Sequence, residues 1–153
     1  MNISNIIAYN ADSHFASIIA GLPGNPVEDV SLQNIKIYYR QLDSPAHKIQ
    51  AVVPEHEKTY PEPAKMGVMP AYGFFIRHAV NVRLSDVQIR YLGQETRPAF
   101  YLEDVNGLKL QTINAQPVNG KPTVVAKDVS ELTIKDFYTL KDQFIRNAGT
   151  KKF

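Results

Sequence analysis

Apolar and polar residues alternate along several short stretches of the chain, and these stretches match one another position by position. In NVRLSDVQIRY, residues 81–91, the apolar positions are Val82, Leu84, Val87 and Ile89, with Asp86 between the two pairs. The corresponding positions in DVSLQNIKIYY, residues 29–39, are Val30, Leu32, Ile35 and Ile37, with Asn34 between them. Such a match predicts an internal repeat, which decides the architecture before single-residue propensities are considered.

Three further stretches fit the same template: NISNIIA at 2–8, NGLKLQTINA at 106–115 and SELTIKDFYT at 130–139. Their central polar positions are Asn5, Thr112 and Asp136. The spacing is 29 residues from Asn5 to Asn34, 26 from Asp86 to Thr112 and 24 from Thr112 to Asp136. The 52 residues from Asn34 to Asp86 are two such periods or one period plus an insertion. A second apolar run precedes most copies: ASIIAG, GFFIRHAV, AFYLEDV and TVVAKDV.

A period in the twenties with two or three short strands per copy is typical of a β-solenoid, in which each copy forms one coil. The sequence therefore predicts an all-β chain of about five coils. Stacking would bury two rows of side chains: Leu32, Leu84, Leu110 and Ile134 in one, and Ile35, Val87, Ile113 and Phe137 in the other. A β-sandwich also uses short strands at such spacings and is the alternative fold. Only residues 131–147 could form an amphipathic helix, and their first half already matches the repeat.

The central position of every copy is a short polar residue. Asn and Asp tolerate left-handed backbone and bond neighbouring backbone groups, so we expect this row to form the bend between two strands of each coil. A row of catalytic carboxylates is the alternative interpretation. Other acidic positions also fall at predicted corners: Glu28, Asp29, Glu103, Asp104, Asp128 and Glu131.

Residues 40–72 interrupt the repeat and hold five of the ten prolines. A loop of this length in a compact domain is generally functional or a packed excursion. Tyr60, Glu62 and Tyr72 are residue types that hold sugars, through aromatic faces and carboxylate hydrogen bonds. The alternative is that the two tyrosines only attach the loop to the flank of the coils.

Arg77 and His78 follow the apolar run of residues 73–76. A guanidinium at this flank would donate hydrogen bonds to a saccharide, so Arg77 joins the predicted contacts. His78 is either a further contact or a structural histidine that is satisfied by its neighbours.

Charge and composition narrow the function classes. The net charge is +2 and basic residues are not clustered, so no nucleic-acid partner is expected. The chain has no cysteine, no apolar run long enough for a membrane helix, and no signal peptide at its start, which leaves its location undetermined. His47 and His56 lack a partner at metal-ligand spacing, and neither a Gly-x-Ser-x-Gly motif nor a phosphate-binding loop occurs, so no metal or cofactor is expected.

Four segments together resemble a known family: GLPGNPVEDVSLQNIKIYYR, YPEP, MPAYGFFIRHAVNV and RPAFYLEDVNG. They are similar to the C-terminal coils of family 28 glycoside hydrolases, the polygalacturonase-like pectin enzymes, and to the bacterial branch with a long YPEP insertion. The resemblance spans residues 3–138. It implies a right-handed, single-stranded parallel β-helix, a pectic or related plant polysaccharide as substrate, and a family whose members are typically exported.

The same family uses an acid and a base in an inverting mechanism. Its carboxylates lie in an Asn-Thr-Asp motif and an Asp-Asp pair, supported by Gly-His-Gly and Arg-Ile-Lys motifs, and none of the four occurs in this sequence. We therefore assign no catalytic residue and expect no activity from the chain alone. The alternatives are a free-standing β-helix module for carbohydrate binding or assembly, and an enzyme whose site is rebuilt at a subunit interface.

The expected layout is one domain, with coils over residues 1–39 and 73–139, an insertion over 40–72 and a capping tail over 140–153. The repeat is already under way at Ile3, so the first coil would expose Ile3, Ile6 and Ala8. We therefore expect a homo-oligomer joined through the N-terminal coil. The tail would cover the last coil with Leu140, Phe144 and Ile145.

Overall fold

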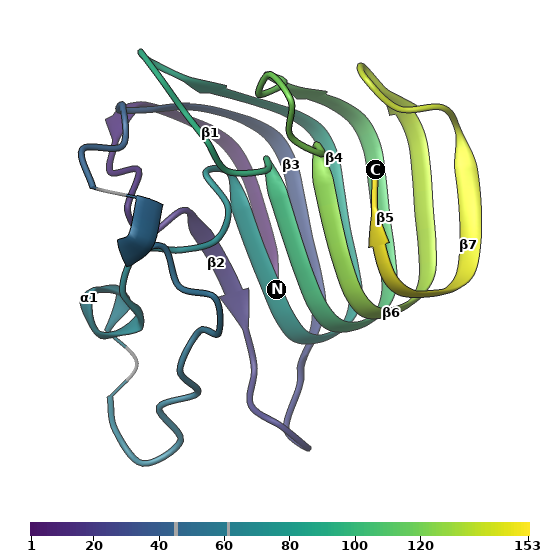
Figure 1. The fold of residues 1–153 in the computed structure, drawn as a ribbon. Helices are drawn as coiled ribbons and strands as arrows, with labels where there is room; N and C mark the ends of the chain where they lie inside the picture. Colours follow the sequence, from purple (N-terminus) through teal and green to yellow (C-terminus); the bar gives the residue numbers. More distant parts are fainter. Residues whose placement is uncertain (45, 61) are drawn as a thin grey trace.

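The computed structural model of the chain describes residues 1–44, 46–60 and 62–153. These residues form one sheet of seven strands in the order β1-β3-β4-β5-β6-β7, with β2 beside β4 (Figure 1). The strands are β1 (Asn2–Ala11), β2 (Ser17–Ala20), β3 (Val27–Tyr39), β4 (Phe74–Tyr91), β5 (Phe100–Ala115), β6 (Val124–Phe137) and β7 (Gln143–Lys152).

The pairing between strands is almost entirely parallel. Every pair among β1 to β6 is parallel, and β7 runs antiparallel to β6. The chain is thus all-β, and the β-sandwich alternative is wrong because sandwiches are built from antiparallel sheets. The helical alternative for residues 131–147 is also wrong, since they contribute to β6 and β7.

The register confirms the repeat read from the sequence. The first predicted row is Leu32, Leu84, Leu110 and Ile134, and each member pairs with the next across β3, β4, β5 and β6. The structure extends this row to Ile3 of β1, which pairs with Leu32. Because β3 pairs directly with β4, the 52-residue spacing is one period plus an insertion. The run at 16–21 is the earlier equivalent of residues 73–78, as Ser17 pairs with Phe74.

The long strands bend where residues adopt left-handed backbone. The predicted bend row, Asn5, Asn34, Asp86, Thr112 and Asp136, has φ between 49° and 59°. The structure adds two further rows that were not predicted as such: Asp29, Asn81, Gly107 and Glu131 in one, and His78, Asp104 and Asp128 in the other. Asn and Asp reach this conformation at lower cost than other non-glycine residues, which explains their number at the bends.

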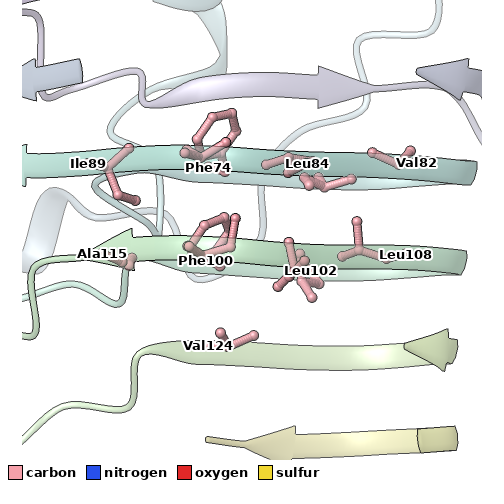
Figure 2. Packing of buried hydrophobic residues seen from close by; sticks show 14 of the residues in the cluster. Phe74, Val82, Leu84, Ile89, Phe100, Leu102, Leu108, Ala115 and Val124 are labelled. Atoms are coloured by element: carbon pink, nitrogen blue, oxygen red, sulfur yellow. The ribbon is translucent and has the colours of Figure 1, made fainter. Parts of the chain in front are cut away.

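The inward side chains form one continuous core, shown in Figure 2. Leu84, Leu102 and Leu108 are fully buried, and the rings of Phe74 and Phe100 stack 5.5 Å apart. Burying such a side chain stabilises the fold by ~2 kcal/mol relative to leaving it exposed. Stacking of equivalent residues from strand to strand is therefore the main source of stability.

The two ends of the strand order differ. β7 closes one end as an antiparallel strand, and Leu140 and Ile145 pack against the core as predicted. The prediction for Phe144 is wrong, because this side chain is 57% exposed. At the other end, β1 is an edge strand, and an apolar hollow of about 380 Å³ opens beside it, lined by Ile3 and Ile6 among others.

The insertion contains both helices of the described residues, η1 (Ala46–Lys48) and α1 (Pro63–Met66). Neither is long and apolar enough to cross a membrane. Figure 1 shows the insertion beside the stacked strands, on the side of β2.

Candidate functional site

The insertion is held against the outer face of the sheet by a second apolar cluster. Phe75 points outward from β4, opposite to the inward Phe74, and is fully buried by Val53, Met66 and Met69 of the insertion. Tyr101, which pairs with Phe75 on the next strand, packs against this cluster with its ring 5.9 Å away. The insertion is therefore a packed element and not a free loop.

Arg77 anchors the insertion through its guanidinium. It is 2% exposed, and its Nη1 and Nη2 donate to the carbonyl oxygens of Val53 and Pro54 at 2.7 and 3.1 Å. Nη1 also lies 3.1 Å from Oε1 of Glu55. The expectation that Arg77 contacts a saccharide is corrected here, because its donors face the insertion and are shielded from solvent.

His78 joins three elements beside this anchor. Its Nδ1 lies 2.6 Å from Oδ2 of Asp104 on β5, and its Nε2 lies 3.1 Å from Oε1 of Glu55 in the insertion. Burial lowers the pKa of His78, but the hydrogen bonds and charges of Asp104 and Glu55 outweigh it and raise the pKa above its usual value. With a carboxylate at each nitrogen, the ring satisfies both only as imidazolium. His78 is thus a structural clasp, as the second interpretation held.

The Glu55 and Arg77 pair still has unused hydrogen-bonding capacity. Glu55 Oε2 and Arg77 Nε are buried and have no partner in the part of the chain that the structure describes. Hollows of about 220 and 300 Å³ flank the clasp, the first lined by Glu55 and Thr59 and the second by His78 and Asp104. The carboxylates of Glu55 and Asp104 are both engaged by His78. This geometry suits attachment of the insertion to the sheet.

Tyr72 is also structural. It is fully buried, its hydroxyl donates to the carbonyl of Gln116 at 2.6 Å, and its ring meets Tyr39 and Tyr91 edge-on. Burial raises the pKa of its hydroxyl. The expectation that Tyr72 offers a ring face to a sugar is therefore corrected, and its position agrees with the alternative that it attaches the loop.

Tyr60 and Glu62 remain at the surface of the insertion. Tyr60 is 76% exposed, and Glu62 is exposed with Nζ of Lys65 at 3.9 Å. His56 is engaged by the carbonyl of Lys65 at 2.9 Å, whereas the side chain of His47 lies outside the described residues. Of the five predicted contacts, Tyr60 and Glu62 are exposed, His78 is partly buried, and Tyr72 and Arg77 are buried.

Sequence reasoning missed the most buried ion pair. Arg97 is 2% exposed, with Nε and Nη2 bonded to the carboxylate of Glu95 at 2.9 and 2.7 Å. Its Nη1 donates to the carbonyls of Ser13 and Met69, so it ties the end of the insertion to two loops. The available signal was Arg97, the first residue of a segment that carries the family resemblance, placed two residues after Glu95. Both charges would need partners if buried.

Four of the six predicted corner carboxylates lie at bends, and Asp104 and Asp128 occupy matching positions on β5 and β6. Asp29, Asp104, Asp128 and Glu131 all have left-handed backbone. Among residues 1–44, 46–60 and 62–153, no group of three or more His, Asp or Glu side chains is placed to hold a metal ion. The left-handed backbone of these four residues places them at bends, as expected for corner positions.

Comparison with protein-family models, curated proteins and solved structures finds no match to this chain.

Proposed function

We propose that the chain is a right-handed parallel β-helix of about five coils and forms the C-terminal part of a polygalacturonase-like, family 28 glycoside hydrolase. Its substrate class would be pectic or related plant polysaccharide. The chain contributes the fold and saccharide contacts. The acid and base belong to coils with the Asn-Thr-Asp and Asp-Asp motifs, which this sequence lacks.

One observation carries the proposal: the segments that bear the family resemblance also attach the insertion. The segment of residues 69–82 contributes Tyr72, Arg77 and His78, and that of residues 97–107 contributes Arg97 and Asp104. A resemblance at such buried, interlocked positions supports a shared architecture, because these residues depend on one another's geometry.

The same attachment supports saccharide binding. A loop docked by apolar packing and buried hydrogen bonds presents its outer surface in a defined position, which lowers the ordering cost of binding. Tyr60 offers an exposed ring for the C–H face of a sugar, while Glu62 and Lys65 offer an acceptor and a cation beside it. Lys58 adds a second cation nearby in the sequence and Glu57 beside it adds a second carboxylate, so the charges at this surface are balanced and its contribution to binding rests on the ring of Tyr60 and on hydrogen bonds.

Binding and turnover of tetragalacturonate and of a rhamnogalacturonan oligosaccharide test the proposal. We expect no release of reducing ends, and binding that Tyr60→Ala weakens by about fivefold or more through loss of stacking. The matched control is Tyr9→Ala, which removes a tyrosine of similar exposure, 72%, from β1. Unchanged affinity in both Tyr60→Ala and Glu62→Ala, or turnover abolished by a single Asp or Glu substitution, contradicts the proposal.

A non-catalytic assembly module is the second candidate, and a separate observation favours it. β1 is an edge strand whose ten residues carry no charged side chain, and Ile7 and Tyr9 on it are 77% and 72% exposed. Edge strands are commonly protected by charges or proline, so an unprotected edge beside an open apolar hollow favours pairing with another strand.

A further inference from the structure

A groove lies on the outer side of the sheet, away from the insertion. It has a volume of about 400 Å³ and contains none of the insertion residues. Its lining follows the bend row and the position two residues beyond it in successive strands: Lys36, Asp86, Gln88, Thr112, Asn114, Asp136 and Tyr138 are the polar members. The groove therefore crosses the strands from β3 to the end of β6.

The register sets these side chains in a regular row. Lys36 pairs with Gln88, and Gln88 pairs with Asn114. The backbone N–H of Tyr138 donates to the carbonyl of Ile113, which places Tyr138 next in the row. Neighbouring strands are about 4.8 Å apart, so this row offers one polar or aromatic side chain at each such step along the groove.

The polar side chains in the groove have unused hydrogen-bonding capacity. Within the part of the chain that the structure describes, none of the seven makes a side-chain hydrogen bond, and Oδ1 of Asn114 is buried without a partner. Elsewhere the bend residues bond one another, as Asn34 does with Asn5 at 2.8 Å and His78 with Asp104. A buried amide oxygen without a donor is costly unless a ligand or water supplies one.

Tyr138 and the charges indicate the class of ligand. Tyr138 is 73% exposed, so its ring is open to stacking at one end of the row. The lining carries two carboxylates, Asp86 and Asp136, against the single ammonium of Lys36. This balance disfavours a chain of uronates and favours a ligand with many hydroxyls and no charge.

We propose that this groove binds a neutral oligosaccharide, with Tyr138 stacking on a sugar ring and Gln88, Asn114 and Asp136 bonding its hydroxyls. The proposal goes beyond the function inferred from the insertion, and it shares with that function only the saccharide as ligand class. The groove and the insertion surface have no residue in common, so an experiment can contradict one proposal without contradicting the other.

The test is a titration of the ¹⁵N-labelled chain with galactotetraose and with tetragalacturonate, followed by backbone amide shifts. Galactotetraose is expected to shift amides of residues 86–88, 112–114 and 136–138 and to bind more tightly than tetragalacturonate at these positions. Tyr138→Ala is expected to lower the affinity for galactotetraose by about fivefold to tenfold. Asn114→Ala is a second variant that keeps the aromatic ring.

Tyr60→Ala is the matched control, since it removes an exposed tyrosine from the insertion and leaves the groove unchanged. Galactotetraose affinity that survives Tyr138→Ala, shifts confined to other residues, or no shifts at millimolar sugar overturns the proposal. If Tyr60→Ala loses tetragalacturonate binding and retains galactotetraose binding, the insertion surface and the groove are two independent saccharide sites.

Discussion

At the residue scale, the bends depend on residues that accept left-handed backbone. Four of the five members of the predicted bend row are Asn or Asp, which made this row visible in the sequence. The other two rows mix His, Glu and Gly with Asn and Asp, so their composition gave no common signal. At these positions the neighbouring strands on either side impose the left-handed backbone. The residue type at such a position therefore does not predict the bend.

Thr112 is the member of the bend row that fits its backbone least. It is β-branched at φ 54°, where Cβ branching is disfavoured, and its hydroxyl makes no hydrogen bond in the described residues. Thr112→Asn is expected to raise the free energy of unfolding by ~1 kcal/mol, because Asn accepts this conformation more readily. Chemical denaturation measures the change. Thr133→Asn, at an extended position of β6, is the control and is expected to be neutral or destabilising.

His78 predicts a pH-dependent contribution to stability. Its pKa is raised on folding, so protonation stabilises the folded chain fully below the unfolded pKa of 6.5 and progressively less as the pH rises through the folded value. His78→Asn keeps a residue suited to the bend, where φ is 46°, and removes the clasp to Glu55 and Asp104. The stability difference between wild type and this variant should be larger at about pH 6 than at about pH 9. If the stability difference between wild type and His78→Asn does not depend on pH, or if His56→Asn gives the same pH-dependent difference, the proposed role of the ion pairs of His78 with Glu55 and Asp104 is contradicted.

At the element scale, strand positions were predictable and the attachment of the insertion was not. Alternation of apolar residues specifies which side of a strand is buried, and this sufficed to align Leu32, Leu84 and Leu110. Arg77, Arg97 and Tyr72 are buried although two are charged and one is polar. Their burial follows from partners brought together by the fold, over 24 residues between Arg77 and Val53 and 84 between Arg97 and Ser13. Sequence pattern alone carries no information on such pairs.

Neighbouring residues of β4 test the strand register. Leu84 is fully buried between Leu32 and Leu110, whereas Arg83 is exposed and reaches Oε1 of Gln111 at 3.2 Å. Leu84→Asp is expected to prevent folding, because an unpaired buried carboxylate costs several kcal/mol. Arg83→Asp is expected to change stability by less than ~1 kcal/mol. Thermal melts and far-UV circular dichroism of the two variants decide this, and similar melting temperatures would rule out the register.

At the scale of the whole molecule, the two ends of the sheet present different surfaces. The last parallel strand is covered by β7, whose antiparallel direction stops further parallel stacking and whose sequence includes Arg146, Lys151 and Lys152. The edge at β1 carries no charge and leaves the inward rows accessible from the hollow beside it. The exposure of Ile6, at 40%, agrees with the expected open end, while Ile3 and Ala8 are only partly exposed.

This asymmetry leads to a prediction about assembly. Because only the β1 end is open, pairing of like ends closes a dimer, whereas head-to-tail pairing would have to use the covered end. Light scattering at micromolar concentration is expected to give about twice the 17.2 kDa of the chain. Ile6→Lys places a charge in the inward row at the open end and should yield monomers, since an ammonium there would be desolvated between two copies. Ile7→Lys is the control, because Ile7 pairs with the outward Lys36 and a lysine there stays in water. A monomeric wild type, or equal masses for the wild type and Ile6→Lys, would show that the β1 edge of this chain does not pair with itself.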